Sequence, residues 1–586
     1  MINIKEDERL NVLNHSSAHV LAQAVKRLYP QAKFWVGPVI EDGFYYDIDL
    51  GDTHISEEDF PKIEQMMRKI SKEDKRITRI ELTKDEALDM FKDDEYKLDI
   101  INRLPEDETI SAYQQAEFID LCRGPHVATT KEVKFFKLLK ASGAYWKGDA
   151  KNQMLQRIYG ITFDTQAELD AYEAWLEAAK QRDHKKLGRE LDLFMMSEYG
   201  PGMPFWLPNG MTLRHALDTV YRKMHLDRGY VFTETPTMLS KELWEISGHW
   251  GNYADNMYTS IIEEREFAIK PMNCPGGMLV YKNGLHSYRD LPIRLAEMGH
   301  VHRYEASGAL NGLFRVRSFT QDDAHIFMTQ SQLQDEIIEI LDFIDEIYTV
   351  FGLEYTIELS TRPEANYIGS IENWDASEQA LKDAMDAAGK PYKINEGDGA
   401  FYGPKLDFKV RDSLNRVWQC GTVQLDNNLP ERFDLVYVDE TGQKQRPLML
   451  HRAIFGSIER FIGILIEHFG GAFPVWLSPL QVEVIPVNTE FHMDYANKVA
   501  ETLKEAGLRV HVDGRNEKLG YRLREAQKNK TPLQLIIGDA EIESGSVNLR
   551  RYGERAQNSM QLDAFLELAL NEVKDRTIHV IETEEK

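Results

Sequence analysis

The first 190 residues contain two kinds of hydrophobic pattern. Apolar side chains within residues 15–28 recur at the spacing of one helical face, and they predict a helix: Ala18, Leu21, Ala22 and Val25. Residues 34–48 are rich in β-branched and aromatic side chains around Gly and Pro turn signals, so they predict short strands. Residues 164–190 contain strong helix formers without a complete apolar face, which predicts one partly exposed connecting helix.

The pattern changes twice in the rest of the chain. From residue 191 to about 473, β-branched and aromatic runs are broken by Gly and Pro, which predicts an antiparallel sheet flanked by helices. After residue 474 the order becomes β-α-β-α-β and predicts a small three-layer α/β domain. Its expected segments are strand 482–487, helix 495–506, strand 508–512, helix 521–529 and strand 533–537.

Length and cysteine content set broad limits. A chain of 586 residues is too long for one hydrophobic core and favours three or four domains. The most apolar stretch, residues 453–477, is interrupted by Glu459, Arg460 and Glu467, which argues against a membrane span. The N-terminus lacks the apolar run of a secretory signal. With only three cysteines, no disulfide framework is expected, and the predicted location is the reducing cytoplasm.

Charge and missing motifs narrow the possible ligands. The net charge of −26 argues against a nucleic-acid partner unless basic residues cluster locally, because phosphate binding needs Lys and Arg. The sequence has no G-x-x-x-x-G-K-[ST] loop, and the Gly-rich segment 397–403 lacks the spacing of a dinucleotide fingerprint. If ATP is a substrate, arginines are expected to hold its phosphates, since a planar guanidinium grips phosphate oxygens in pairs.

The densest group of chemically useful residues lies between positions 297 and 325. Strand-like residues flank a loop with Ser-Gly and Asn-Gly pairs, so the segment predicts a hairpin. It would bring together Arg303, Glu305, Arg315 and Phe319. Arginine binds phosphate, phenylalanine stacks on a base and glutamate accepts from an exocyclic amine. The alternative is a salt-bridged sheet face, which is the better interpretation for any single arginine.

Together these residues resemble motif 2 of the class II aminoacyl-tRNA synthetases. Residues 450–461 resemble motif 3, a strand that enters a helix with a terminal arginine, here Arg460. Residues 233–236 resemble the end of motif 1, which lies at the subunit interface in that class, so a homodimer is implied. The sequence contains neither a HIGH-like nor a KMSKS-like segment, the two signatures of the class I synthetases.

Four further segments are similar to the threonyl-tRNA synthetases: 270–276, 319–327, 400–405 and 419–426. The resemblance runs from about residue 5 to the C-terminus. It implies attachment of L-threonine to tRNA(Thr) through threonyl-adenylate. It also implies a multidomain α+β and α/β fold, with an α+β editing domain (1–163), a linker helix (164–190), a class II catalytic domain on an antiparallel sheet (191–474) and a three-layer α/β anticodon-binding domain (475–586).

The resemblance assigns contacts with ATP and Mg²⁺. Arg303 is expected to hold the α-phosphate and Glu305 the adenine amine. Phe319 is expected to stack under adenine with Arg460 above it, and Arg315 to reach the outer phosphates. Mg²⁺ accompanies ATP because its charge offsets the phosphates.

Transfer to tRNA involves one further residue by resemblance. His249 matches a histidine near the terminal ribose and joins Arg303 and Arg460 as an expected catalytic residue. An alternative function is a non-catalytic paralogue that binds RNA as a regulator. The intact arginines argue against that alternative.

The resemblance also implies one Zn²⁺ in the catalytic site, held by Cys274, His325 and His451. They lie too far apart in sequence for spacing to reveal a site. Three protein ligands leave a position open for the amine and hydroxyl of threonine, and valine has no hydroxyl. Asp323 and Tyr402 are expected to hold the hydroxyl and the amine. The full set implied around threonine is Met272, Gln321, Asp323, Tyr402 and Gln424.

One position departs from the family pattern. Family members usually have a histidine after Asn-Cys-Pro-Gly, where this chain has Gly277. Gly277 is not one of the three ligands, so zinc is expected to remain, with weaker local support for the Cys274 loop or for bound substrate. Lowered activity, or compensation by a neighbouring residue, is expected. The departure is the only sequence feature that favours the regulatory paralogue.

A second, hydrolytic site is expected because serine also has an amine and a hydroxyl. Serine lacks the methyl group of threonine, and this difference changes the binding free energy by only about 1–3 kcal/mol. The N-terminal module supplies four residues suited to such a site: His15, His19, Cys122 and His126. Residue types alone leave a tetrahedral zinc site and a metal-free cleft equally open. The resemblance implies metal-free hydrolysis of seryl-tRNA and adds Lys97, Asp120 and either Tyr45 or Tyr46.

The C-terminal module resembles an anticodon-binding domain. The implied RNA-facing residues are Asn516, Lys518, Arg524, Glu541 and Arg550. Splayed anticodon bases are read by side-chain hydrogen bonds, so an acidic residue is compatible with this role. A solvated charged face is an equally good interpretation of Lys518 alone. Family members often begin with a further small domain, which this sequence is expected to lack. Affinity for tRNA is the property that its absence is expected to affect.

Overall fold

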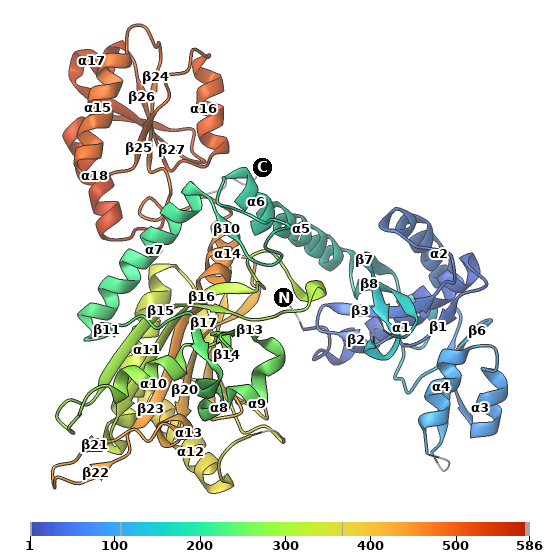
Figure 1. Ribbon diagram of the computed structural model, residues 1–586. Helices are drawn as coiled ribbons and strands as arrows, with labels where there is room; N and C mark the ends of the chain where they lie inside the picture. Colours follow the sequence, from blue (N-terminus) through green and yellow to red (C-terminus); the bar gives the residue numbers. More distant parts are fainter. Residues whose placement is uncertain (1–2, 106–107, 150, 366, 580–586) are drawn as a thin grey trace. The chain divides into compact units, whose positions relative to one another are not determined.

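The computed structural model describes residues 3–105, 108–149, 151–365 and 367–579. It divides into two compact units, Met1–Ala178 and Ala179–Lys586 (Figure 1). Each unit has its own buried apolar core. Within the described ranges, none of the helices combines the length and the apolarity that a membrane crossing requires.

The first unit contains a five-stranded sheet that packs against α1 (Glu8–Leu28), and α1 in turn contacts α2 (Phe60–Lys72). The sheet order is β1-β3-β8-β7, with β2 beside β3. Its strands are β1 (Lys33–Phe34), β2 (Val39–Ile40), β3 (Gly43–Asp49), β7 (Phe135–Tyr145) and β8 (Met154–Phe163). The predicted helix and short strands are confirmed. The helix begins before the predicted residue 15, because the Asp7 side chain caps it by accepting a hydrogen bond from the Leu10 amide.

A smaller three-stranded sheet completes this unit. It has the order β4-β5-β6 and is accompanied by two short helices. Their bounds are β4 (Ile77–Leu82), α3 (Lys84–Met90), α4 (Glu95–Arg103), β5 (Ile110–Gln115) and β6 (Phe118–Leu121). Lys97 lies on α4 and Asp120 on β6, and Asp120 Oδ2 lies 3.5 Å from Nε2 of His19 on α1.

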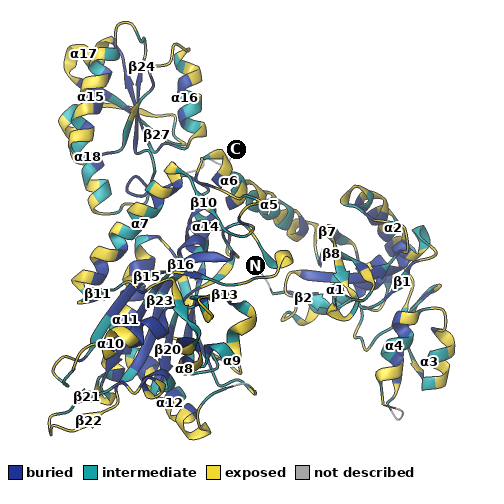
Figure 2. Cartoon of the chain, viewed as in Figure 1, coloured by how far each residue is buried: buried dark blue, intermediate teal, exposed yellow. Residues whose placement is uncertain are grey.

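The predicted single connecting helix is wrong in one respect. Two helices occupy the segment, α5 (Gln166–Arg182) and α6 (His184–Glu190). Asp183 lies between them and its carboxylate accepts from the amides of Lys185 and Lys186, which starts a new helix. Leu169 is the buried residue of α5, and Figure 2 shows its otherwise exposed and half-buried surface. The predicted partial exposure is therefore confirmed.

The second unit is built on an eight-stranded sheet in the order β11-β15-β16-β23-β20-β19-β17-β18. Within this sheet, as far as the structure describes it, only the terminal pairs are parallel, β11 with β15 and β17 with β18. The strands are β11 (Val231–Phe232), β15 (Ile293–His302), β16 (Ser318–Met328), β17 (Glu354–Ser360), β18 (Tyr392–Asn395), β19 (Lys405–Arg411), β20 (Val417–Asp426) and β23 (Leu448–Ser457). The predicted antiparallel sheet is confirmed, including the β15–β16 hairpin.

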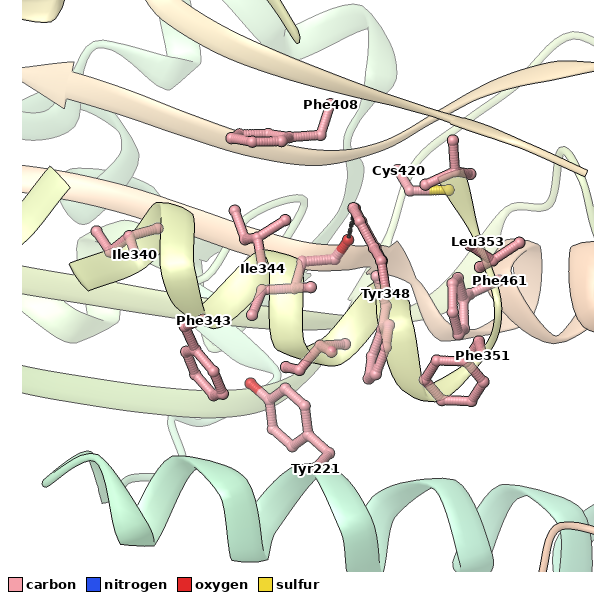
Figure 3. Packing of buried hydrophobic residues seen from close by; sticks show 14 of the residues in the cluster. Tyr221, Ile340, Phe343, Ile344, Tyr348, Phe351, Leu353, Phe408, Cys420 and Phe461 are labelled. Carbon is pink, nitrogen blue, oxygen red and sulfur yellow. Dashed lines mark hydrogen bonds between the residues drawn. The ribbon is translucent and has the colours of Figure 1, made fainter. Parts of the chain in front are cut away.

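Helices cover this sheet and bury its core. They are α7 (Pro208–Asp227), α11 (Leu333–Val350), α12 (Ile371–Ala388) and α14 (Ile458–His468). Figure 3 shows Phe343 and Tyr348 of α11 packed between Tyr221 of α7 and Phe408 of β19. Strand β23 leads directly into α14, as the resemblance to motif 3 predicts. Short elements on the site side are α8 (Lys241–Ser247), α9 (His249–Tyr253), α10 (Cys274–Lys282) and α13 (Asn428–Arg432), with the small sheet β12 (Met238–Ser240), β14 (Arg265–Ile269) and β13 (Tyr258–Ile262).

The C-terminal segment forms a separate sheet in the order β25-β24-β26-β27-β28. The five predicted elements are confirmed as β24 (Val482–Pro486), α15 (Met493–Glu505), β25 (Val510–Val512), α16 (Leu519–Lys528) and β26 (Leu533–Ile537). They are followed by α17 (Asp539–Ser544), β27 (Ser546–Arg551), β28 (Gln557–Gln561) and α18 (Leu562–Lys574). Helices lie on both faces of the sheet, which gives the predicted three layers (Figure 1).

A buried asparagine joins α1 to the larger sheet of the first unit. Asn14 donates from Nδ2 to the Thr162 carbonyl and accepts from the Thr162 amide at Oδ1, each at 2.9 Å. We expect Asn14→Ala to leave both backbone groups of Thr162 unpaired and to lower the free energy of unfolding of this unit by about 1–3 kcal/mol. Hydrogen exchange of α1 and β8 in the full chain measures this loss. Asn11→Ala is the control, since the Asn11 amide contacts Lys5 at an exposed position; equal exchange in the two variants would contradict the prediction.

Candidate active site and N-terminal pocket

The three predicted zinc ligands converge, although they lie far apart in sequence. Cys274 is the first residue of α10, and His325 on β16 lies opposite His451 on β23 in the strand register. One ligand atom of each residue lies within 4.8 Å of the others. Neighbouring strands present facing residues side by side, so the sheet brings the two histidines together and α10 adds Cys274.

The surroundings of these residues fit a zinc ion. Asp426 Oδ2 lies 2.9 Å from His451 Nε2, the kind of carboxylate contact that orients a metal-binding imidazole. Buried His325 has an Nε2 atom with no hydrogen-bond partner, and burial lowers its pKa to about 4, so the ring is neutral. Burial also raises the pKa of the Cys274 thiol in the metal-free protein. One sulfur and two imidazoles are typical zinc donors, and three ligands leave a position open.

Gly277 lies one helical turn after Cys274 and faces His325. A Cβ atom at this position would lie 3.1 Å from His325 Nδ1, tighter than ordinary contact. A side chain at this position would therefore require the His325 ring to shift by a few tenths of an ångström. This contact gives a physical basis for expecting position 277 to affect the zinc site.

The residues predicted to bind threonine surround the cluster. The Tyr402 ring lies 5.2 Å from that of His451, and Gln424 pairs with His451 in the strand register. Asp323 Oδ2 accepts from Asn273 Nδ2 at 3.1 Å. The Met272 sulfur lies 3.2 Å from His249 Nε2, which is itself 3.7 Å from the Cys274 sulfur. Gln321 is on the same side of β16 as Asp323, and its Oε1 is buried without a partner.

Sequence reasoning missed two supporting residues in this cluster, Asp426 and Asn273. Asp426 is the last residue of the segment 419–426 and lies two positions after Gln424, so the alternation of β20 places both on one face. That alternation is the only local feature of the sequence that indicates a place for Asp426 in the site. The contact with His451 depends on the pairing of β20 with β23, which no spacing reveals.

The predicted ATP residues form two pairs, and Arg460 lies apart from both. The Arg303 guanidinium lies 5.2 Å from the centre of the Phe319 ring, so a cation lies beside a stacking surface. Arg315 Nε contacts Glu305 Oε2 at 3.0 Å, so these two side chains pair with each other. Arg460 instead lies 5.9 Å from the Trp418 ring, and its Nε is buried without a partner.

The N-terminal module brings its four predicted residues together in a cluster. The sulfur of Cys122 lies 3.2 Å from His15 Nε2 and 3.2 Å from His126 Nε2. His19 lies beside them, with ring centroids 4.3 Å from those of His126. The cluster borders a cavity of about 310 Å³. Four ligand atoms within 4.8 Å of one another keep both the metal-bound and the metal-free interpretations open on geometry alone.

A buried ion pair forms the wall of this cavity. Lys97 Nζ lies 2.6 Å from Asp120 Oδ1, and the Tyr46 hydroxyl contacts both residues. Tyr45 faces elsewhere, with the Arg157 guanidinium 3.8 Å from its ring centre. The geometry therefore favours Tyr46 over Tyr45 as a member of this site.

Burial determines the charge states in this cavity. It lowers the pKa of His19 to about 4 and also lowers the pKa of His15 and His126. Burial raises the pKa of the Cys122 thiol to about 12. It acts in the same direction on Asp120, but the charge of Lys97 and the hydrogen bonds from Lys97 and Tyr46 outweigh it, and the pKa of that carboxyl falls. Neutral imidazoles and a neutral thiol therefore surround a charged pair.

The predicted anticodon residues lie on several elements of the C-terminal module. Asn516, Lys518 and Arg524 are exposed around the start of α16. Glu541 caps α17 by accepting from the Gly538 amide, and Arg550 Nε donates to the Glu554 carbonyl. Sequence reasoning missed buried Arg522, which donates to the carbonyls of Asp513 and Glu517 and shapes the loop that carries Asn516.

The neutral histidines generate a pH prediction for the first unit. A lowered pKa in the folded state means that the unfolded chain binds protons first, so stability is complete above about pH 6.5 and falls as the pH drops toward 4. We expect hydrogen exchange of α1 in the full chain to accelerate between pH 7 and pH 5 after correction for intrinsic rates. His126→Asn should flatten this dependence, whereas His54→Asn, which changes an exposed ring in the same unit, should not. Equal slopes in all three proteins would overturn the prediction.

Comparisons with known proteins cover nearly the whole chain. Residues 258–469 match a class II tRNA synthetase core domain (G, H, P, S and T), residues 481–572 an anticodon binding domain, and residues 110–159 the second additional domain of threonyl and alanyl tRNA synthetases. The threonine–tRNA ligase of Fusobacterium nucleatum is 56% identical over 97% of this chain and 92% of its own length. That of Clostridioides difficile is 53% identical over 98% and 90%. A solved RNA binding domain of threonyl-tRNA synthetase from Cryptosporidium parvum has a TM-score of 0.64 and 42% identity, over 66% of this chain and 98% of that domain.

Proposed function

Since the chain belongs to the threonyl-tRNA synthetase family, we propose that its catalytic core selects threonine through a zinc ion held by Cys274, His325 and His451. As a member of this family it attaches L-threonine to tRNA(Thr) with ATP and Mg²⁺, and its N-terminal module is the editing domain. The observation that carries the proposal is the convergence of one thiol and two imidazoles from α10, β16 and β23.

The chemistry of the three ligands explains which amino acids enter. Zinc bound by them would accept both the amine and the hydroxyl of threonine, a pair of groups that valine does not have. In this proposal Asp323, whose Oδ2 accepts from Asn273 Nδ2, also accepts a hydrogen bond from the substrate hydroxyl. Tyr402, Gln424, Gln321 and Met272 form the rest of the pocket in this proposal. Serine carries the same two groups as threonine, so this site admits it.

Amino-acid activation then depends on arginines. The threonine carboxylate attacks the α-phosphorus of ATP in line, which forms threonyl-adenylate and releases pyrophosphate. Arg303 lies beside Phe319, so it can neutralise the α-phosphate while adenine stacks on the ring. Nucleotide binding would separate the Arg315–Glu305 pair, freeing Arg315 for the outer phosphates and Glu305 for the adenine amine. Arg460 covers the other face of adenine in this proposal.

Transfer to tRNA uses a histidine beside the metal ligands. The terminal ribose hydroxyl attacks the adenylate carbonyl and AMP leaves. Burial lowers the pKa of His249 to about 4, so its imidazole is neutral and able to accept a proton. Its position against Met272 and Cys274 supports a role next to the reacting carbonyl.

Assembly and location follow from the same family assignment. We propose a homodimer through the motif 1 region, where Leu226 and Val231 are 59% and 53% exposed and would lose that apolar exposure at an interface. The proposed location is the cytoplasm, where reducing conditions keep the three cysteines as free thiols. Asn516, Lys518, Arg524, Glu541 and Arg550 are the proposed anticodon contacts.

The editing site is proposed to work without a metal. His15, His19, Cys122 and His126 would hold the water that attacks the seryl ester, and the Lys97–Asp120 pair would position the substrate. A neutral imidazole can take the proton of that water as the ester bond breaks.

ATP–pyrophosphate exchange tests the catalytic proposal. We expect exchange with threonine and with serine, and discrimination against valine of about 10⁴ or more. The purified chain should contain one zinc ion, which Cys274→Ala loses together with exchange activity. Cys122→Ala is the matched control and should retain both zinc and exchange. Exchange with valine at the rate for serine, or two zinc ions per chain, would contradict the proposal.

Deacylation of seryl-tRNA(Thr) tests the editing proposal. We expect His15→Ala to slow deacylation by about 10²-fold or more, since it removes a proposed proton acceptor, and to leave threonylation within about twofold of native. Tyr46→Phe and Tyr45→Phe form a matched pair, because only the Tyr46 hydroxyl contacts Lys97 and Asp120. Deacylation that is unaffected by His15→Ala, or equal effects of the two tyrosine variants, would rule out this assignment.

A further inference from the structure

A bulge in β23 lies between the predicted zinc ligand and the predicted ATP arginine on the same strand–helix segment. Gln321 of β16 pairs with Ser457, and Asp323 pairs with Ala453. Between these pairs β16 advances by two residues and β23 by four, so residues 454–456 leave the regular ladder. His451 precedes the bulge and Arg460 follows it, on the first turn of α14.

One carboxylate accepts all three amides that the bulge exposes. Asp322 Oδ2 accepts from the amides of Ile454 and Phe455 at 2.8 and 3.0 Å, and Oδ1 accepts from Gly456 at 2.8 Å. Asp322 has no solvent exposure. Buried amides without partners are costly, so a bulge at this depth depends on such an acceptor.

Two further contacts define the shape of the bulge. The Tyr348 hydroxyl of α11 donates to the Ile454 carbonyl at 2.6 Å, and Figure 3 shows Tyr348 within the core beneath the sheet. Gly456 has a φ of +77°, and a Cβ there would lie 2.6 Å from the Cys420 carbonyl oxygen of β20. The backbone can therefore pass this point only as glycine and in one conformation.

The bulge also determines where α14 begins. Immediately after it, Ser457 Oγ caps the helix by accepting from the Arg460 amide, and Glu459 Oε2 accepts from the Thr320 amide of β16. Asp322 alternates with Gln321 and Asp323 along β16 and so points away from the threonine pocket. Its polar contacts are the three bulge amides and, at 4.0 Å, the buried Arg452 guanidinium, which separates its role from those of Gln321 and Asp323.

We propose that Asp322 is a positioning residue for ATP binding, which acts by holding the bulge at residues 454–456 and thereby placing Arg460. Tyr348 supports the same bulge from the other side of its backbone. The inference rests on the proposed role of Arg460 in ATP binding. It predicts that loss of the Asp322 contacts weakens ATP binding and not threonine binding. Asp323 and His451 lie in the regular part of the β16–β23 pairing, on the other side of the bulge from Arg460.

The test is pyrophosphate exchange with Asp322→Asn. The side-chain amide keeps the volume but presents a donor to at least one of the three backbone amides. We expect the KM for ATP to rise about tenfold or more, with the KM for threonine within about twofold and zinc unchanged at one per chain. Tyr348→Phe removes one hydrogen bond and should raise the KM for ATP to a smaller extent, which keeps the test valid if Asp322→Asn does not fold.

Asp439→Asn is the control, since Asp439 also accepts two backbone amides in the same unit but lies in an exposed turn. It should leave both KM values unchanged. A merely structural role of Asp322 would lower the melting temperature and the active fraction while leaving both KM values unchanged, and this result would overturn the proposal. A parallel rise in the two KM values would also overturn it. Absence of pyrophosphate exchange in the native chain would instead contradict the proposed function itself.

Discussion

The antiparallel pairing of β16 with β23 is the constraint on which the catalytic site depends. It sets His325 opposite His451 and brings α14 to the edge of the same pocket. Because side chains alternate along a strand, a slip of one residue would move His325 and Asp323 to the opposite face of the sheet. The bulge at residues 454–456 adds a second requirement, because it interrupts the regular pairing of β16 with β23 just before α14 begins. The proposed metal ligands on the sheet and the proposed nucleotide arginine thus share one backbone framework.

Burial gives the two sites related chemistry. In both, imidazoles lie close to a cysteine thiol, and removal from water lowers the pKa of His19 and of His325 and raises the pKa of the two thiols. The difference lies in the neighbouring carboxylates. Asp426 contacts a proposed metal-binding imidazole directly, whereas Asp120 is engaged mainly by Lys97 and Tyr46. Similar donor sets therefore support a metal site in the catalytic core and a hydrolytic site in the N-terminal module.

Two sites are needed because threonine differs from valine and from serine in different ways. A site built to bind a hydroxyl group discriminates strongly against a substrate without one, because the polar groups of the site are then left unpaired. A single methyl group, by contrast, changes the binding free energy by only about 1–3 kcal/mol. A catalytic pocket that recognises amine and hydroxyl rejects valine and accepts serine. The remaining discrimination requires separate hydrolysis in a separate cavity, which the N-terminal module provides in the proposed function.

The sequence by itself determined most of the local structure and the family. Periodicity was sufficient for α1 and for the five elements between β24 and β26, because helix and strand patterns are local. It failed at Asp183, where a capping side chain divides one helical run into two. The motifs carried the class II resemblance and the site residues assigned from it. Only the tertiary structure decided which residues meet: His325 faces His451, Asp426 contacts His451, Tyr46 rather than Tyr45 reaches Asp120, and Asp322 holds residues 454–456. These contacts join segments that are distant in sequence, and the register and bulges of the sheet, which no local pattern encodes, bring them together.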